Sequence, residues 1–210
     1  MSYAVKEIFK TLQGEGAQAG RAAVFCRFTG CNLWSGREQD RATADCRFCD
    51  TDFVGTNGSQ GGRYATSDAL ATAIEQAWAG PRAHRFAVLT GGEPLLQVDT
   101  ALIEVLHARG FEIALETNGT LELPSPVDWL CVSPKTSDPL KVRSGNELKL
   151  VYPQEALPPE SFAHLDFQRF SLQPMDGADI IENTARAVAY CLAHPQWQLS
   201  TQTHKHIGIR

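Results

Sequence analysis

The sequence predicts an α/β protein whose parallel strands form a sheet covered by helices, either open or curled into part of a barrel. From residue 64 onward, short apolar segments typical of buried strands alternate with amphipathic helical patterns. Strands that alternate with helices favour a parallel sheet. The predicted strands also end in polar or glycine-rich segments, as strands do at the ligand-binding edge of such sheets.

The first 63 residues predict two strands followed by a long loop. YAVKEIFKTLQGEG indicates a short strand through Val5 and Ile8 that continues into a glycine-containing loop, and AAVFCRF at 22–28 indicates a second strand. The stretch 29–63 is irregular and contains three of the six cysteines. Loops of this length tend to be functional.

The remaining elements alternate along the chain. SDALATAIEQAWAG predicts a helix with Ser67 as its N-cap and Gly80-Pro81 as its end. VDTALIEVLHARG and DIIENTARAVAYCLA predict two more helices. The predicted strands are residues 85–90, 111–116, 128–133, 147–152, 169–173 and 197–202.

Composition excludes several classes of protein. The 210 residues suffice for one domain with a full core, and 43% hydrophobic with 20% charged residues is typical of a soluble globular protein. The formal net charge of -5 provides no basic field for nucleic acid, so we expect no nucleic-acid partner. The N-terminus resembles no secretion signal and no long apolar segment is present, so we expect a cytoplasmic protein without a membrane partner.

Polar groups follow five of the predicted strands. A single polar turn is most often an ordinary surface loop. Five turns that carry carboxylate, amide, hydroxyl and amine groups favour a binding site at this edge of the sheet. The segments are Thr90-Gly91-Gly92-Glu93-Pro94, Glu116-Thr117-Asn118-Gly119, Ser133-Pro134-Lys135, Gln173-Pro174 and Thr203-His204.

The cysteines fall into two groups. Cys26, Cys131 and Cys191 lie in apolar strand or helix patterns, where we expect small core residues. The other three, at positions 31, 46 and 49, lie in the long loop, and a reducing compartment disfavours disulfides there. No histidine before position 84 completes a four-ligand zinc site, although a catalytic zinc needs only three ligands and a redox pair needs two. Three thiolates also suit a [4Fe-4S] cluster, and their spacing alone does not separate these alternatives.

Two motifs together resemble the radical S-adenosylmethionine (SAM) superfamily: Cys46-Arg-Phe-Cys49 and the Gly91-Gly92-Glu93-Pro94 turn. Six stretches are further similar to the 7-carboxy-7-deazaguanine synthase family, namely residues 12–16, 25–33, 46–51, 116–119, 133–135 and 173–176. The fourteen residues between Cys31 and Cys46 depart from the usual short spacing of the superfamily, but this family tolerates insertions there. Residues 35–45 and the C-terminal tail are outside the similarity.

The resemblance implies a single radical SAM domain over residues 1–210, folded as a partial TIM-type barrel with a cluster-binding insertion at about 29–63. It implies a lyase of the queuosine pathway of tRNA modification. Such an enzyme contracts the ring of 6-carboxy-5,6,7,8-tetrahydropterin to 7-carboxy-7-deazaguanine with loss of ammonia. The implied cofactors are one [4Fe-4S] cluster per chain, SAM used catalytically, and Mg²⁺. The implied partners are a second copy in a homodimer and an electron donor such as flavodoxin.

The resemblance also implies roles for individual residues. The metal ligands are Cys31, Cys46 and Cys49 for the cluster and Thr51 for Mg²⁺. The residues that bind SAM are Phe48, Cys49, Asp50, Gly92, Glu93, Ser133, Pro134, Lys135, Gln173, Pro174, Met175 and Asp176. The residues that bind the substrate are Leu12, Gln13, Gly14, Glu15, Arg27, Thr90, Asn118, His204 and Arg210.

Glu15 and Arg27, and also Glu116 as the predicted catalytic residue, have a chemical rationale of their own. The Glu15 carboxylate suits a planar edge with paired N–H donors, and the Arg27 guanidinium suits a carboxylate. Glu116 ends a predicted central strand, where we expect it to do acid/base work or to hydrogen-bond the substrate. By contrast, His204 and His206 lie in a tail that is more often ordinary surface.

Two other functions stay open at this point. One is a non-enzymatic zinc- or thiol-bearing binding module, which does not explain the ordered polar strand ends. The other is a radical SAM activase that makes a glycyl radical on a partner protein. The loop Gln13–Gly16 and Arg27 favour a small carboxylated substrate over a protein.

Overall fold

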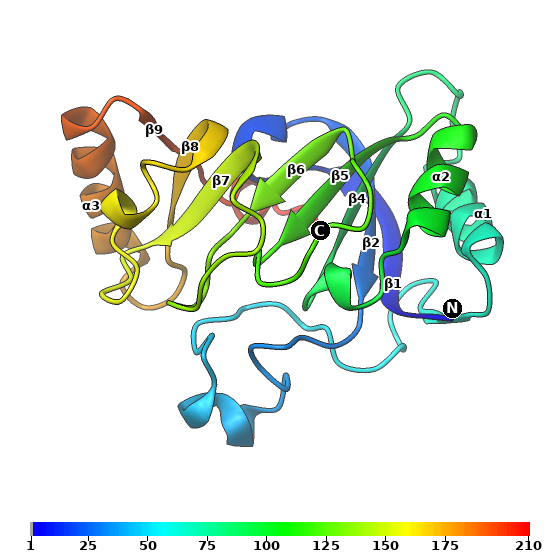
Figure 1. The fold of residues 1–210 in the computed structure, drawn as a ribbon, viewed down its shortest axis with the longest axis horizontal. Helices are drawn as coiled ribbons and strands as arrows, with labels where there is room; N and C mark the ends of the chain where they lie inside the picture. Colours follow the sequence, from blue (N-terminus) through cyan, green and yellow to red (C-terminus); the bar gives the residue numbers. More distant parts are fainter. Residues whose placement is uncertain (1) are drawn as a thin grey trace.

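The computed structural model describes residues 2–210, and the strands in this part of the chain form one nine-stranded sheet (Figure 1). The strand order is β3-β1-β2-β4-β5-β6-β7-β8-β9. The strands are β1 (Tyr3–Leu12), β2 (Ala22–Phe28), β3 (Gly62–Tyr64), β4 (Phe86–Gly91), β5 (Glu112–Thr117), β6 (Trp129–Val132), β7 (Ser144–Tyr152), β8 (Asp166–Pro174) and β9 (Trp197–Leu199). From β2 through β9 all pairings are parallel, whereas β1 is antiparallel to both β2 and β3. The sheet is not closed, and the predicted α/β class with a partial barrel is confirmed.

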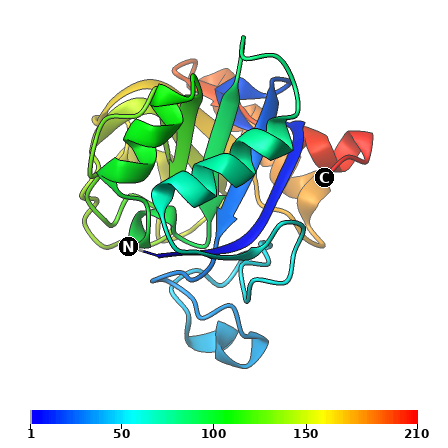
Figure 2. The same ribbon diagram turned by 90° about the vertical axis from the view of Figure 1, so that its right-hand side faces the viewer.

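In the described part of the chain, four α-helices accompany the sheet: α1 (Ser67–Trp78), α2 (Thr100–Ala108), α3 (Ile180–Ala193) and α4 (Thr203–Ile207). Figure 2 shows α1 and α2 side by side over one end of the sheet, and Figure 1 shows α3 near β8 at the other end. The helix α1 begins one residue earlier than predicted, because Thr66 and not Ser67 is the N-cap, and the Thr66 hydroxyl accepts from the Ala69 amide. Short 3₁₀ helices lie at Gly16–Gln18 (η1), Glu38–Thr43 (η2), Pro94–Leu96 (η3) and Pro159–Ser161 (η4).

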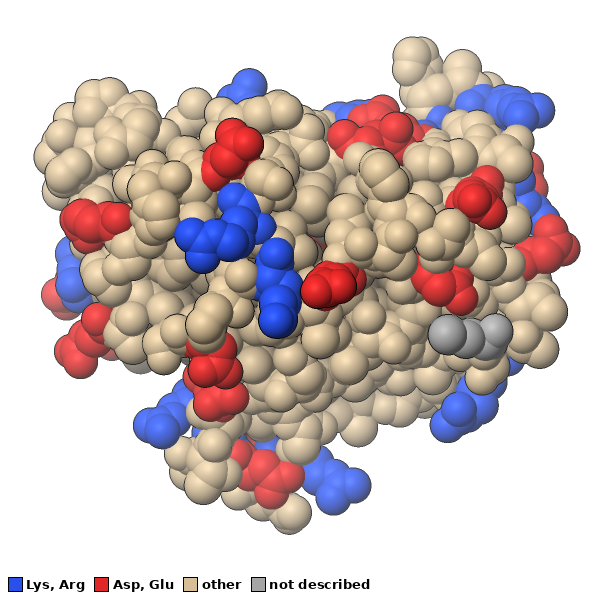
Figure 3. All heavy atoms as spheres, in the orientation of Figure 1, with Lys and Arg blue, Asp and Glu red and all other residues tan. Residues whose placement is uncertain are grey.

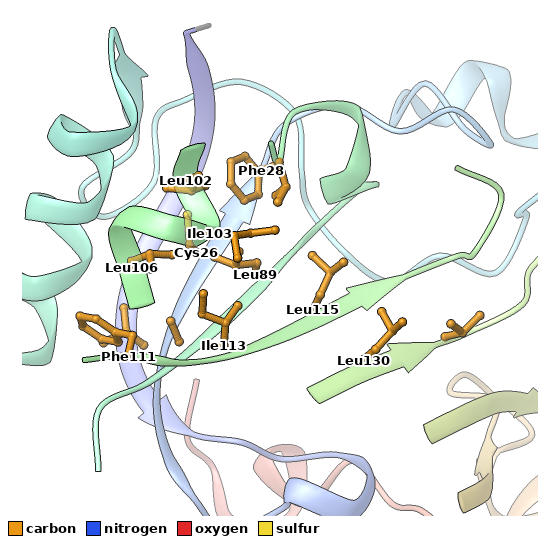
Figure 4. Packing of buried hydrophobic residues seen from close by; sticks show 14 of the residues in the cluster. Cys26, Phe28, Leu89, Leu102, Ile103, Leu106, Phe111, Ile113, Leu115 and Leu130 are labelled. Carbon is orange, nitrogen blue, oxygen red and sulfur yellow. The ribbon is translucent and has the colours of Figure 1, made fainter. Parts of the chain in front are cut away.

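The hydrophobic core lies between the sheet and the helices α1 and α2 (Figure 4). Leu102 and Leu106 of α2 pack here together with Leu89 and Ile113 of the sheet, and all four are fully buried. Cys26 is also fully buried in this cluster, which confirms it as a core residue. Cys131 is buried as well but faces the opposite side of the sheet, and Cys191 is only half-buried.

The other face of the central strands is polar. Successive residues of a strand point to opposite sides of the sheet, so the residues that alternate with the core leucines lie on this face. Leu115, Leu130, Leu148 and Leu172 belong to the core. Their strand neighbours Glu116, Cys131, Lys149 and Gln173 line a pocket instead. Strands β5 to β8 therefore separate an apolar layer from a charged one.

The loop after β1 crosses this polar face. The Ala17 amide donates to the Glu147 carboxylate at 3.0 Å, and the Gly16 amide donates to the Ser200 hydroxyl at 2.9 Å. Glu147 is only 1% exposed and also accepts from Ser171 at 2.6 Å. These bonds join the start of the chain to β7, β8 and the C-terminal segment across the open side of the sheet.

The described surface carries charges of both signs, and Figure 3 shows them interspersed over the visible face. Within residues 2–210, none of the helices combines the length and the apolar character that a membrane crossing requires.

We predict that Gly92→Ala destabilises the fold, because a Cβ at this position would lie 2.2 Å from the Gly30 carbonyl oxygen. Overpacking against a backbone atom typically lowers the free energy of unfolding by about 1–3 kcal/mol. Gly62→Ala is the control, since its Cβ would have its nearest neighbour at 4.0 Å. Equal urea unfolding midpoints for the two variants would contradict the prediction.

Candidate active site

A pocket of about 380 Å³ lies on the polar face, at the carboxyl ends of the parallel strands. Of the residues assigned from the sequence to cofactor, metal or substrate, all but Glu93 and Pro134 line it. It therefore brings together residues from β1 to the C-terminus. The sequence-predicted lining residues are Leu12, Gln13, Gly14, Glu15, Arg27, Cys31, Cys46, Phe48, Cys49, Asp50, Thr51, Thr90, Gly92, Glu116, Asn118, Ser133, Lys135, Gln173, Pro174, Met175, Asp176, His204 and Arg210.

The three loop cysteines lie together on one side of the pocket. Cys46 is buried, and Cys31 and Cys49 are half-buried. A hydrogen bond from Cys46 lowers the pKa of Cys49 to about 6, and the same bond raises the pKa of Cys46. The Lys135 ammonium faces these thiols, and burial lowers its own pKa.

These three thiols fit a [4Fe-4S] cluster. Thiolates are the ligands that such a cluster needs, and each one binds a different iron. Within residues 2–210, no three His, Cys, Asp or Glu side chains lie close enough together to bind a single metal ion. This finding does not exclude a cluster, because the ligands of a cluster bind different irons. A [4Fe-4S] cluster held by these three cysteines would leave one iron for a further ligand.

The loop that carries the cysteines is held by two basic residues. Arg41 stacks on Trp34, with its guanidinium 4.1 Å from the ring centroid, and donates to the Cys49 carbonyl at 3.1 Å. Lys6 of β1 pairs with Asp52 at 2.7 Å and donates to the Val54 carbonyl. In Figures 1 and 2 this loop projects beyond the edge of the sheet.

Glu93 points into the protein and away from the pocket. It is fully buried, and it accepts hydrogen bonds from the Leu95 amide, the Asn118 amide and the Thr117 hydroxyl at 2.8–2.9 Å. Burial raises its pKa. Glu93 thus fixes the Gly91–Pro94 turn to the end of β5, and the turn itself faces the pocket through Gly91 and Gly92.

Asn118 is in the pocket lining, but its side chain is already engaged. Its amide nitrogen donates to Asn32 at 3.0 Å, and its amide oxygen accepts from Thr120 at 2.7 Å. These bonds tie the end of β5 to the segment that follows Cys31.

One end of the pocket contains two carboxylates around a lysine. The Lys149 ammonium lies 2.6 Å from one oxygen of Glu15 and 3.7 Å from one oxygen of Glu116. Glu116 also accepts from Gln13 at 3.0 Å and from Thr90 at 3.1 Å. We call Glu15, Glu116 and Lys149 the carboxylate–lysine cluster.

Arginines line a different part of the pocket. Glu7 and Arg27 lie opposite each other on β1 and β2, and the Arg27 Nε donates to Glu7 at 3.0 Å. The Arg210 side chain pairs with the same carboxylate and stacks on Phe9 with 4.4 Å to the ring centroid. Glu7 therefore holds two guanidinium groups at the β1–β2 side of the pocket.

The C-terminal tail folds over the pocket, so the expectation of an ordinary surface tail was wrong for His204. The Thr203 amide donates to the Gly14 carbonyl at 2.9 Å, and His204 is half-buried against Gly14. Lys205 bridges Asp50 at 2.7 Å and Asp176 at 2.6 Å. His206 is exposed and lies outside the pocket lining, as expected for a tail residue.

The residues of this site that were not predicted from the sequence include the polar residues Glu7, Lys149, Gln202 and Lys205. A signal existed for Lys149, because Glu147 and Lys149 alternate with leucines in the predicted strand 147–152. Gln202 and Lys205 had no such signal, since the tail residues become part of the site only through tertiary contacts.

Comparisons with known proteins identify the class. The sequence profile of the Radical SAM superfamily matches residues 39–149, and the chain is a member of that superfamily. A 7-carboxy-7-deazaguanine synthase of Bradyrhizobium diazoefficiens is 67% identical over 210 residues, and one of Caulobacter vibrioides is 66% identical over 209 residues. Both matches cover 100% of each chain.

A solved structure agrees with these relatives. The crystal structure of QueE from Escherichia coli superimposes with a TM-score of 0.73 at 30% identity, covering 97% of this chain and 95% of that one. The protein belongs to the 7-carboxy-7-deazaguanine synthase family.

Proposed function

We propose that this protein converts 6-carboxy-5,6,7,8-tetrahydropterin into 7-carboxy-7-deazaguanine and ammonia. The observation that carries the proposal is the polarity of the pocket. It presents carboxylates to one part of a ligand and the Arg27 guanidinium to another, beside three cysteines. The substrate has a matching arrangement, because a guanidine-like edge and a carboxylate lie at opposite ends of a fused two-ring system.

We assign the cofactors to the cysteine side of the pocket. Cys31, Cys46 and Cys49 would hold the [4Fe-4S] cluster, which when bound would supply the electron for reductive cleavage of SAM. Gly92, Lys135 and the polar strand ends would hold SAM. Those strand ends are Ser133-Pro134-Lys135 and Gln173-Pro174-Met175-Asp176, with Phe48 and Asp50 from the cysteine loop.

The substrate would lie between the carboxylate–lysine cluster and Arg27. Glu15 and Glu116 accept from the N–H donors of the pterin edge, since each carboxylate keeps lone pairs beyond those used within the protein. The Arg27 terminal nitrogens bind the substrate carboxylate, because its Nε is already directed to Glu7. Asn118 takes a supporting role through Asn32, rather than a direct contact.

The product and ammonia together contain every atom of the substrate. The conversion therefore needs no net oxidant, in agreement with SAM used catalytically. Glu116 is suited to move a proton during the loss of ammonia, as its carboxylate lines the pocket next to the Thr90 hydroxyl.

Thr51 is the residue we propose for Mg²⁺. It is half-buried in the pocket lining, two residues after Cys49. Mg²⁺ commonly takes few protein oxygens and completes its shell with substrate oxygens and water. A cation bound there by Thr51 and the substrate would polarise the substrate's oxygens.

We further propose that residues 1–210 act as one domain in a homodimer, in the cytoplasm, with a small electron-transfer protein such as flavodoxin as donor. An apolar surface supports the dimer. Ile181 and Leu192 of α3 are 85% and 79% exposed, and Val188 lies between them on the same helix face.

The proposed reaction is tested by anaerobic turnover of the reconstituted protein with SAM, Mg²⁺, reductant and 6-carboxy-5,6,7,8-tetrahydropterin. We expect 7-carboxy-7-deazaguanine by mass, without stoichiometric loss of SAM. Cys49→Ala should abolish both bound iron and product, whereas Cys191→Ala, outside the pocket, should retain them. SAM cleavage without this product would keep the radical chemistry and exclude the substrate, as a glycyl-radical activase would require.

We predict that Thr51→Ala weakens Mg²⁺ activation, because the variant lacks a protein oxygen ligand. The half-saturating Mg²⁺ concentration in the turnover assay should rise about tenfold to a hundredfold, within the range typical of altered metal sites. Thr56→Ala, a loop threonine outside the pocket, is the control. An unchanged rate and an unchanged Mg²⁺ dependence in Thr51→Ala would remove the metal from this position.

A further inference from the structure

Lys149 is a buried ammonium in the middle of the polar face. It lies on β7 with its side chain only 6% exposed. It lines the main pocket and also a small cavity of about 10 Å³ on the other side of Glu15 and Glu116. The lysine therefore contacts the two carboxylates at the wall between the cavities.

The charges around Lys149 do not balance. Glu15 and Glu116 together provide two negative charges for one ammonium, and the Glu147 carboxylate lies two positions earlier on the same face of β7. The other titratable groups that face this region come from several elements. They are Asp50 of the cysteine loop, Cys131 of β6, Lys135 after β6 and His204 of α4.

We propose that Lys149 is a positioning residue that sets the specificity of the pocket for a ligand edge with adjacent N–H donors. The proposal rests on the proposed function, in which Glu15 and Glu116 accept from the pterin edge. Lys149 occupies one lone pair of Glu15 and keeps both carboxylates as acceptors. A ligand with an oxygen in place of the pterin amino group would meet those carboxylates with a second acceptor.

The charge of Lys149 is what keeps Glu15 an acceptor. Burial disfavours the ionised form of Glu15, but the Lys149 charge and hydrogen bonds from Lys149, Gln202 and Gln173 outweigh burial and lower the pKa of Glu15 to about 2. Without the ammonium, two neighbouring carboxylates would share a proton. The shared proton would then be directed at the N–H donors of the ligand, which would weaken binding.

The test measures binding of two probes to the reconstituted protein with SAM, by fluorescence. One probe is 6-carboxypterin, an oxidised analogue of the substrate, and the other is 6-carboxylumazine, in which oxygen replaces the 2-amino group. We expect the wild-type protein to prefer the pterin by about tenfold or more, the usual effect of hydrogen bonds to a charged group. Lys149→Met and Lys149→Gln should lose most of this preference, and Lys149→Arg should retain it.

A pH series separates this role from a merely structural one. The dissociation constant of Lys149→Met for 6-carboxypterin, divided by that of the wild type, should rise as the pH falls from about 8 to about 5.5. The rise should approach tenfold per pH unit if one proton is taken up. The ratio cancels the titration of the ligand, which is the same for both proteins.

The outcomes distinguish the proposed function of the protein from the role of Lys149 in specificity. A wild-type protein that binds neither probe would overturn the proposed function. The role of Lys149 alone would be overturned by a different result: the wild-type protein prefers the pterin, the Lys149 variants prefer it equally, and the ratio of the dissociation constants does not change with pH. If Lys149→Met does not fold by circular dichroism, Lys149→Gln decides, because its amide can still donate to Glu15.

Discussion

The ion pair between Lys149 and Glu15 is the contact on which the arrangement of this pocket depends. A buried ion pair is stable only when its geometry is good and further hydrogen bonds complete it. Here the ammonium and the carboxylate are 2.6 Å apart, and Gln202 of the C-terminal segment donates a further hydrogen bond to Glu15. The pair thus joins β7, the loop after β1 and the tail across the open side of the sheet, where no strand pairing does so.

The Lys149–Glu15 ion pair also separates chemically different parts of the pocket. The polar face of β5 to β8 provides carboxylates, while the cysteine loop and the strand ends provide thiols and backbone groups. Lys205 links the cysteine loop to a strand end, since it bridges Asp50 beside Cys49 and Asp176 after β8. An open sheet with such links can surround a ligand that has hydrogen-bond donors at one end and a carboxylate at the other, without closing into a barrel.

Much of the fold and most of the site could be predicted from the sequence, because hydrophobic periodicity and the motifs at strand ends are local signals. The strand β3 was missed because its three residues form only by pairing with β1. The tail helix α4 is short, and its contacts with Gly14 and Asp50 are tertiary. Glu93 was expected at SAM because the Gly91–Pro94 turn resembles a radical SAM motif, whereas the Thr117 hydroxyl and two amides hold the Glu93 side chain inside the protein.

The measurement that tests this account most directly is a double-mutant cycle for Glu15 and Lys149, read as the free energy of unfolding in urea. We predict that Lys149→Met destabilises the protein by about 3–5 kcal/mol, because it leaves the carboxylates of Glu15 and Glu116 without their buried partner. Glu15→Gln should destabilise it less, because Glu116 still faces the ammonium. The double variant should be more stable than the sum of the two changes predicts, by about 2 kcal/mol or more. Additive effects would show that the two charges are not coupled and would contradict the account.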